Sequence, residues 1–477
     1  MILGSEVVLR KVEHLLWDLS RIGPLPSELA GKVRPTESRD VFLRRVAFHH
    51  WIHCSHPDRN PELWNSRYRP DRNPFNFLND QVVNFEVSDC LFQGASQLFH
   101  NVHNGRIVRN EFSNGMGTCW TALAQGAVVV VAEKNDLRCS SSWGYGRIGI
   151  DRVFSSENIC HNFVQGEREA MTLDISATPA TPPGPVPEGS SNPNGIHNRN
   201  IAWFGFPEKV GPNQIVLRGI RSQAGQFVGK TVMVLDGPGV GQFRRIVQNT
   251  ADRFFLDRPW DVLPTPASTL GLWDLSRQMI VSRCEGYDTS SFAQLWGSFY
   301  EYIVDDCRVE RSQGLWGQSG WFVQFRNNQI RYGHAYHPKI GMRGPNPEGN
   351  SPFGYLGLMD GDLRITKFGS AQYGSPEGKP LFVREVLGRQ IPGIRGFVMK
   401  GNTLAYNQRM VLVPSPSAPE GPEPLLIDAM VENNQVFQST VGLAWGDRVR
   451  GVLSKGNRFE SVDQPYAGDM ARIKIAP

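Results

Sequence analysis

A short pattern of apolar and polar residues recurs three times in residues 277–339. The copies read QMIVSRCEGYD, YEYIVDDCRVE and WFVQFRNNQIR. In each copy an apolar run ends in polar residues, a Cys or Asn follows, and a second short run comes next. This alternation has the period of strands and shows no helical spacing. The equivalent positions Cys284, Cys307 and Asn328 stand 23 and 21 residues apart, a repeat length that predicts a β-solenoid.

The Cys or Asn of each copy belongs to a column that continues in both directions along the chain. Asn tolerates a left-handed backbone turn, and stacked Asn side chains can hydrogen-bond from one coil to the next. Cys is small enough to take the same position. We therefore expect one such residue in each coil, at Cys90, Asn110, Asn135, Asn158, Cys284, Cys307, Asn328, Asn402, Asn434 and Asn457.

This column and the strand repeat together resemble the right-handed parallel β-helix of the pectin-lyase-like superfamily. The resemblance covers most of residues 80–340 and, more loosely, residues 395–465. It implies an all-β solenoid from a carbohydrate-active superfamily. It selects no single activity, because this fold carries hydrolases, lyases, epimerases and adhesins.

A linker rich in Pro, Gly and Ser at residues 179–195 interrupts the coils. The following unit contains GKTVMVLDGPGVGQFRRIV and LDRPW, which resemble a small β insert found in bacterial and phage β-helix proteins. Its Gly-Pro-Gly-Val-Gly string lacks the Gly-Lys-Ser/Thr of a nucleotide-binding loop, so we interpret it as a hairpin turn. We expect N-terminal coils in residues 1–195, the insert beside the groove in 196–275, and C-terminal coils in 276–477.

Composition narrows the classes of partner. The 50 basic and 46 acidic residues give a net charge of +4, so no nucleic-acid or membrane partner is expected. No apolar run approaches the roughly 20 residues of a membrane-spanning helix. The first residues do not read as a secretory signal, so the localisation is open, although an extracellular or periplasmic location would suit the function. The seven Cys show no metal-finger spacing, and we predict no metal site from them.

The outward positions of one strand in each coil supply the candidate binding surface. Side chains of a strand alternate between its faces, so Leu295 and Leu315 are predicted to point inward, and Trp296 and Trp316 outward. Rings repeated about 4.8 Å apart would form a platform for the apolar faces of sugars. The alternative is that loops cover these rings and they only pack. The same alternation adds Phe99, Trp120 and Tyr336, the last on a strand expected at residues 333–339.

Two carboxylates near the insert are the candidate catalytic pair. The segment QGEREAMTLD puts Glu169 and Asp174 on the coil from which the insert departs. In a glycosidase one protonated carboxyl group donates to the leaving oxygen, while the other acts as base or nucleophile. We assign Glu169 as the acid and Asp174 as its partner. The alternative is that Glu169 is a solvated turn charge and Asp174 caps a strand end.

A second cluster is basic and begins at Arg331. Here Lys339 and Arg343 could neutralise the carboxylate of a uronic acid, while His334 or His337 removes the neighbouring proton in a β-elimination. Enzymes of this kind often use calcium, but no string of Asp residues reads as a calcium site. One alternative is that both histidines bind a metal ion, although the spacing specifies no further ligands. The other is that both histidines are structural or surface residues.

Together these features predict a β-helix enzyme that cleaves glycosidic bonds of a poly- or oligosaccharide by acid/base hydrolysis. Polysaccharide lyase activity is the enzymatic alternative. A non-catalytic glycan-binding or structural β-helix, as in phage fibres and adhesins, is the alternative from another class. Hydrolysis requires no cofactor, whereas a lyase would suggest calcium. We expect a monomer, because a trimer would favour the spike-like class.

Overall fold

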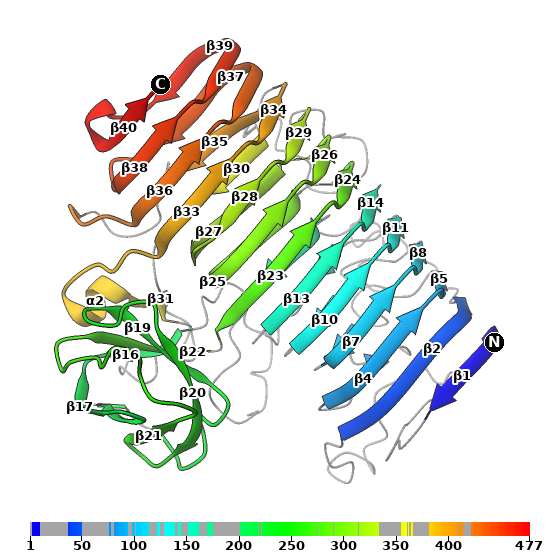
Figure 1. Ribbon diagram of the computed structural model, residues 1–477, viewed down its shortest axis with the longest axis horizontal. Helices are drawn as coiled ribbons and strands as arrows, with labels where there is room; N and C mark the ends of the chain where they lie inside the picture. The colour runs from blue at the N-terminus through cyan, green and yellow to red at the C-terminus, as the bar shows by residue number, and fades with distance from the viewer. Residues whose placement is uncertain are drawn as a thin grey trace, which may run out of the picture.

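The computed structural model shows a solenoid of stacked strands with a small β domain packed against its side (Figure 1). It describes residues 2–9, 37–49, 76–77, 81–93, 98–100, 102–113, 122–124, 128–138, 142–144, 151–161, 169–174, 201–217, 219–220, 222–273, 275–289, 291–312, 314–332, 354–359, 361, 364–365, 381–406, 408–413 and 421–477. The linker predicted at residues 179–195 lies outside the described residues.

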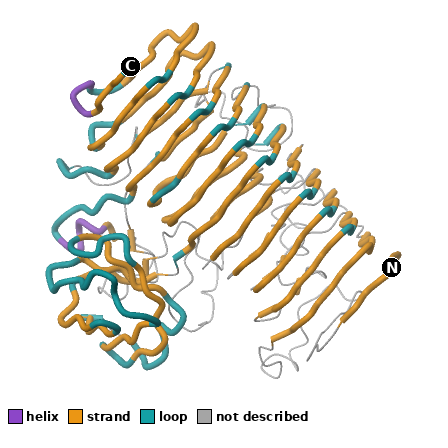
Figure 2. The backbone as a smooth tube through the Cα atoms, viewed as in Figure 1, coloured by secondary structure: helices purple, strands orange, loops and turns teal. Residues whose placement is uncertain are grey.

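The strands of the solenoid form three faces, which we number one to three. Figure 2 shows the strands as successive rungs along the solenoid. Face one contains β1 (Ile2–Leu9), β2 (Glu37–His49), β4 (Gln81–Ser88), β7 (Val102–Val108), β10 (Val128–Glu133), β13 (Asp151–Ser156), β23 (Ser276–Ser282), the second half of β25 (Ser291–Asp305), the end of β27 (Gly314–Trp321), β28 (Gln324–Arg326), β33 (Ile394–Lys400), β36 (Leu426–Glu432), β38 (Val449–Lys455) and β40 (Ile473–Ala476).

Faces two and three are built from shorter strands. Face two contains β5 (Leu91–Gln93), β8 (Glu111–Ser113), β11 (Asp136–Arg138), β14 (Ile159–His161), β24 (Glu285–Tyr287), β26 (Arg308–Glu310), β29 (Gln329–Arg331), β34 (Thr403–Ala405), and the first parts of β37 (Gln435–Trp445) and β39 (Arg458–Ala467). Face three contains β3 (Asn76–Phe77), β6 (Leu98–His100), β9 (Ala122–Ala124), β12 (Ser142–Gly144), β15 (Glu169–Asp174), the first parts of β25 and β27, β30 (Gly354–Leu358), β35 (Gln408–Leu412) and the ends of β37 and β39.

The strand pairing confirms the predicted fold class. Within the described part of the solenoid, every pairing is parallel except that of β1 with β2, which run antiparallel. The chain is therefore an all-β parallel β-helix with a small inserted antiparallel sheet. The residue boundaries that we proposed for its three units remain a proposal.

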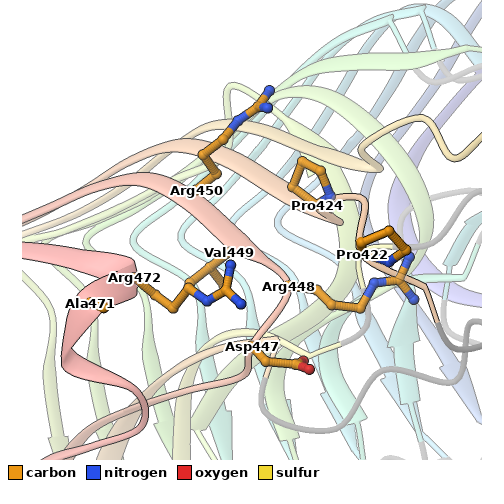
Figure 3. Close-up of a pocket in the computed structure, with 8 residues that line it drawn as sticks. All are labelled: Pro422, Pro424, Asp447, Arg448, Val449, Arg450, Ala471 and Arg472. Atoms are coloured by element: carbon orange, nitrogen blue, oxygen red, sulfur yellow. The ribbon is translucent and has the colours of Figure 1, made fainter.

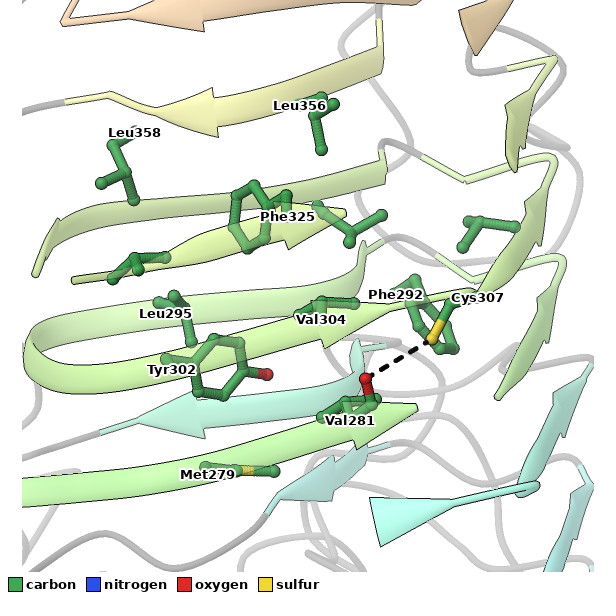
Figure 4. Packing of buried hydrophobic residues seen from close by; sticks show 14 of the residues in the cluster. Met279, Val281, Phe292, Leu295, Tyr302, Val304, Cys307, Phe325, Leu356 and Leu358 are labelled. Atoms are coloured by element: carbon green, nitrogen blue, oxygen red, sulfur yellow. Dashed lines mark hydrogen bonds between the residues drawn. The ribbon is translucent and has the colours of Figure 1, made fainter. Parts of the chain in front are cut away.

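Inward-facing side chains fill the solenoid with one continuous core. On face one, Val281, Val304 and Phe325 follow one another on successive rungs, and each is 0% exposed. Figure 4 shows these three residues stacked beside Leu295. Each such side chain stabilises the fold by about 1.5–3 kcal/mol through burial.

The predicted column of Asn and Cys is a hydrogen-bonded ladder. Asn110 donates through Nδ2 to the Val87 carbonyl at 2.9 Å and to Asn135 Oδ1 at 3.0 Å. Its backbone N–H donates to the same Oδ1 at 3.0 Å. The pattern recurs at Asn135, Asn328, Asn402 and Asn434, while Cys90 and Cys307 donate their backbone N–H to the Asn of the next coil.

The expectation that Asn occupies the left-handed position of the turn is wrong. The left-handed residue is the one before the ladder position, with φ between 51° and 66° in the coils from Asp89 to Gly456. These preceding residues include Arg109, Lys134 and Glu157, which are exposed. The left-handed residue turns the chain, so that the following side chain enters the core. Asn is favoured there because its amide can both donate and accept between coils.

The small domain has its own antiparallel sheet and core. A sequence-distant segment completes the sheet, because β31 pairs with β16 and with β32. The elements are β16 (Ile201–Gly205), β17 (Pro207–Gly211), β18 (Gln214–Leu217), β19 (Thr231–Asp236), β20 (Phe243–Asn249), β21 (Arg253–Leu256), β22 (Thr269–Trp273), β31 (Arg364–Ile365) and β32 (Leu381–Phe382), which leads into α2 (Val383–Leu387).

The conspicuous motifs of the insert have structural roles. The Gly-rich string joins β19 to β20 as a hairpin, with φ of 92°, 80° and 91° at Gly237, Gly239 and Gly241. The nearby Arg244 is 1% exposed and lies over the Trp260 ring at 4.9 Å. Its guanidinium donates to the carbonyls of Pro259 at 2.8 Å and Phe243 at 2.7 Å. These contacts explain the Gln-x-Arg and Arg-Pro-Trp strings without a ligand.

The insert docks on the outer side of face one. A buried cluster combines Met233 and Leu235 of β19 with Trp321 of β27. The Tyr300 hydroxyl donates to the Gly241 carbonyl at 3.1 Å. These contacts bind the insert to the solenoid through both apolar packing and a hydrogen bond. No helix among the described residues is long and apolar enough to cross a membrane.

Replacement of Asn328 by Ala should destabilise the solenoid. The change removes the acceptor of the Cys307 N–H and the donor to the Val304 carbonyl, both buried. A buried polar group left without its partner costs about 1–3 kcal/mol, so the loss of two partners should lower the free energy of unfolding in urea by about 2–6 kcal/mol. The matched control is Gln329→Ala at the adjacent exposed position, expected within about 0.5 kcal/mol of wild type. Equal midpoints for both variants would contradict the role of the ladder.

Replacement of Tyr300 by Ala should loosen the insert without unfolding the solenoid. Its ring meets Phe243 at 5.3 Å and Phe322 at 5.4 Å between centroids. Each such pair is worth about 0.5–1.5 kcal/mol beyond its buried area. Amide exchange should therefore accelerate in residues 237–249 and stay unchanged in the core strands. Val247→Ala, at a side chain 51% exposed on the insert, is the control; unaltered exchange in Tyr300→Ala would show that other contacts hold the insert.

Candidate functional site

Face two presents two outer columns of side chains. The middle residue of each of its short strands points inward, as shown by Cys160, Val309 and Ile330, all 0% exposed. The first and third residues of each strand therefore face outward, with rungs about 4.8 Å apart. From β14 to β29 the first-residue column is Ile159, Glu285, Arg308 and Gln329, and the third-residue column is His161, Tyr287, Glu310 and Arg331.

Four polar residues on two adjacent rungs form what we call the polar quartet: Glu285 and Tyr287 of β24, and Arg308 and Glu310 of β26. The Tyr287 hydroxyl donates to Glu285 Oε2 at 2.5 Å. Arg308 donates to Glu310 Oε1 through Nε at 3.1 Å and Nη2 at 2.8 Å. Register pairs Glu285 with Arg308 and Tyr287 with Glu310, so the two carboxylates occupy one diagonal of the quartet.

The spacing of this diagonal suits chemistry on one sugar linkage. Glu285 and Glu310 lie one rung apart and two residues apart along the strand, so their Cα atoms are about 8 Å apart. Side chains carried on Cα atoms at this spacing can place their carboxyl groups within the roughly 6.5–9.5 Å of inverting glycosidases, a separation that leaves room for a water molecule. Glu285 and Tyr287 are half-buried, and the Glu310 side chain is 13% exposed. The quartet is thus reachable from solvent while its groups are held by one another.

Charge and hydrogen bonding define what each member can do. Burial raises the pKa of Tyr287 to about 12, with a further contribution from its hydrogen bond to Glu285. Tyr287 therefore stays protonated near neutral pH and acts as a donor. The bond to Glu310 raises the pKa of the Arg308 guanidinium, which stays charged. Glu310 also lies 3.6 Å from Nη1 of Arg311, so two guanidinium groups face one carboxylate.

Polar and aromatic groups continue on the rungs around the quartet. Toward the N-terminus, His161 Nε2 lies 2.6 Å from Asp136 Oδ1. Toward the C-terminus, Tyr332 and Tyr406 stack with ring centroids 4.3 Å apart, and each is 36% exposed. Because Tyr332 directly follows Arg331, the stacked rings begin one rung beyond Glu310.

The described residues contain no group of three or more His, Cys, Asp and Glu side chains placed to hold a metal ion. The four cysteines in this part of the chain, Cys90, Cys160, Cys284 and Cys307, are buried. They line the core and the ladder and do not reach the outer columns.

The predicted aromatic strip on face three is described only in part. Leu295 and Leu315 are 0% exposed, as predicted, while Trp316 between the inward residues is partly exposed and therefore faces outward. Trp296 lies on β25 in register with Asp174, without a described side chain. Phe99 lies on β6. The remaining predicted residues lie outside the described residues: Trp120, His334, Tyr336, His337, Lys339 and Arg343.

The strand expected at residues 333–339 as the next rung after β27 is not its partner. That partner is β30, which pairs Leu315 with Leu356 and Trp316 with Gly357. The outward residue that joins this face is therefore Tyr355, whose ring lies under the Arg409 guanidinium at 5.1 Å. The prediction failed because β30 begins 23 residues after the end of β29, whereas β27 begins four residues after the end of β26.

The predicted catalytic pair lies on a single strand of face three. β15 begins at Glu169, in register with Ser291, and ends at Asp174. Five steps along an extended strand separate their Cα atoms by about 16 Å. That is more than the roughly 9.5 Å upper limit for two carboxyl groups that share one glycosidic bond. The pair remains a prediction that only variants can test.

Sequence reasoning missed the quartet because it looked for chemistry on face three. The signal was present in the two short strings Glu-Gly-Tyr and Arg-Val-Glu, each directly after a ladder Cys. In a three-residue strand with a buried middle residue, the first and third side chains must face outward. Of the basic cluster named from sequence, Arg331 lies on the rung next to Glu310.

Comparisons with known proteins connect the chain to phage tailspikes by structure only. No protein-family model matches the sequence, and no curated protein matches it. The tailspike protein gp49 of Pseudomonas phage LKA1 aligns with 75% of this chain and 49% of its own, at 7% identity and a TM-score of 0.23. The gp54 tailspike of Acinetobacter baumannii bacteriophage AP22, solved with a capsular saccharide, aligns with 76% of this chain and 53% of its own, at 8% identity and a TM-score of 0.17. The chain thus spans about half the length of these two tailspikes.

Proposed function

We propose that the protein binds a polysaccharide along face two and cleaves its glycosidic bonds by acid/base hydrolysis at the polar quartet. The observation that carries the proposal is the pair Glu285 and Glu310, two outward carboxylates on adjacent rungs with Cα atoms about 8 Å apart. The solenoid would then be a glycan-acting β-helix of the pectin-lyase-like kind. Its substrate is a poly- or oligosaccharide, and the reaction needs no cofactor.

The hydrogen bonds suggest a role for each member. Glu310 is bound by Arg308 and faces Arg311, which suits a carboxylate that acts as the base toward water. Glu285 accepts from the neutral phenol of Tyr287, a weaker hydrogen bond than one from a guanidinium, so we assign it as the carboxyl group that donates to the leaving oxygen. In this assignment Tyr287 and Arg308 are positioning residues.

The stacked rings of Tyr332 and Tyr406 support a sugar subsite on the same side. They are partly exposed, and their column continues from the bidentate pair of Arg311 with Asp288 at 2.6 and 2.9 Å. Aromatic surface next to fixed polar groups is the usual composition of ligand sites. A glycan that follows the solenoid axis would meet carboxylates first and aromatic rings one rung later.

A second candidate function is β-elimination on a uronic acid. The specific observation in its favour is the contact between His161 and Asp136, since a carboxylate can orient a histidine that removes a proton. This reading keeps the site on face two and changes only the chemistry. A non-catalytic glycan-binding β-helix is the alternative if no bond is cleaved.

Variants in which a carboxylate is replaced by its amide should separate hydrolysis, β-elimination and binding without cleavage. Wild-type protein is expected to release reducing ends from at least one member of a panel of neutral and acidic polysaccharides. Glu310→Gln and Glu285→Gln should each lower kcat about 10²–10⁴-fold, the range of general acid–base catalysis. Asp428→Asn, a matched change at an exposed carboxylate of face one, is the control. Ultraviolet absorbance of the products would identify the lyase.

The same panel tests the competing pair on β15. Asp174→Asn is expected to retain turnover if the quartet is the catalytic centre. Loss of turnover in Asp174→Asn together with full turnover in Glu310→Gln would move the centre to face three. No cleavage of any substrate by folded wild-type protein would leave a glycan-binding or structural β-helix.

A further inference from the structure

We infer that a cavity at the C-terminal end of face one binds the carboxylate of an acidic sugar. The cavity has a volume of about 220 Å³ and lies between the turn into β38 and the 3₁₀ helix η3 (Met470–Arg472). Figure 3 shows its lining residues: Pro422, Pro424, Asp447, Arg448, Val449, Arg450, Ala471 and Arg472. It is separate from the polar quartet, which lies on face two.

The lining is strongly cationic. The lining contains three arginines, Arg448, Arg450 and Arg472, and one carboxylate, Asp447, so its formal charge is +2. A compact cationic lining attracts an anion, and guanidinium groups bind carboxylates through paired N–H donors. The nearest further acid, Asp469, is 3.5 Å from Arg472 Nε. One such exposed contact leaves the lining net positive.

Arg448 gives the cavity a fixed wall. It is 5% exposed, and its Nε donates to the Glu423 carbonyl at 2.9 Å. Its own carbonyl accepts from the Leu425 N–H at 2.8 Å. The Glu423 carboxylate is bound by Arg384 at 3.0 Å, which leaves it directed to a different cation. The guanidinium of Arg448 is therefore held in one orientation before any ligand arrives, which lowers the entropic cost of binding.

Size and wall chemistry favour a single sugar unit. The volume is below the roughly 300–1,000 Å³ of pockets for drug-sized ligands. Pro422, Pro424 and Val449 add rigid apolar surface, which suits the C–H face of a ring better than a free inorganic ion. The inference rests on the proposed function in one respect, that the ligand is a glycan. An inorganic oxyanion shares the charge chemistry, so the test must separate the two.

Binding is measured by calorimetry with glucuronic acid, glucose and inorganic phosphate as probes. Glucuronic acid should bind, and glucose should bind at least tenfold more weakly because it lacks the carboxylate. Arg472→Gln should weaken glucuronic acid about 10–100-fold, the loss of one charge-assisted hydrogen bond. Asp447→Asn should tighten it a few-fold, because a like charge is removed. Arg458→Gln, an exposed arginine on face two, is the matched control.

Arg472→Gln and Asp447→Asn both change exposed side chains, so folding is expected to be unaffected. Equal affinity for glucose and glucuronic acid, or no effect of either variant, would overturn the inference. Phosphate binding without glucuronic acid binding would also overturn it, because the cavity would then select a small ion. Glucuronic acid binding by a protein that cleaves no polysaccharide would contradict the proposed hydrolysis and would still support this binding site.

Discussion

The structure depends on the buried amide ladder that joins one coil to the next. An amide in the core must have its donors and acceptor satisfied, and the amide of Asn135, for example, is satisfied by the coils on either side of it. A coil shifted by one residue would lose these bonds and turn its apolar side chains outward. The ladder therefore sets the register of every face at once. The left-handed residue before each Asn is the backbone device that brings the amide inside.

Because the register is fixed, residues at a constant spacing in the sequence become neighbours on the surface of the solenoid. On face two, strands of three residues leave two outer positions for each coil, so residues 23 positions apart, such as Glu285 and Arg308, become neighbours. The polar quartet follows from two such coils in succession. On face one, the same register aligns Tyr300 with Trp321, and the insert uses these side chains as its docking surface. One face is thus covered while another stays open to solvent.

In the described part of the chain, the insert supplies no residue of the polar quartet. The structure shows how the insert itself is held on face one. Its Gly-rich hairpin and its buried Arg244 are explained by its own packing. Its sheet is closed by β31 and β32, which come from the chain between two much later coils. The polypeptide therefore leaves the solenoid twice to build one small domain. This double connection, together with Tyr300, explains how a small sheet can be held at a defined place.

The sequence by itself determined the solenoid, the ladder positions and the inward or outward direction of residues such as Leu315 and Trp316, because these follow from a repeat and from the alternation of a strand. It could not determine which face carries the chemistry. The partner of β27 and the strands that complete the insert begin far outside the repeat spacing, so the sequence pattern does not point to them. Likewise, the neighbours of Glu310 and the arginines around the C-terminal cavity come from separate coils, and only the stacking of those coils brings them together.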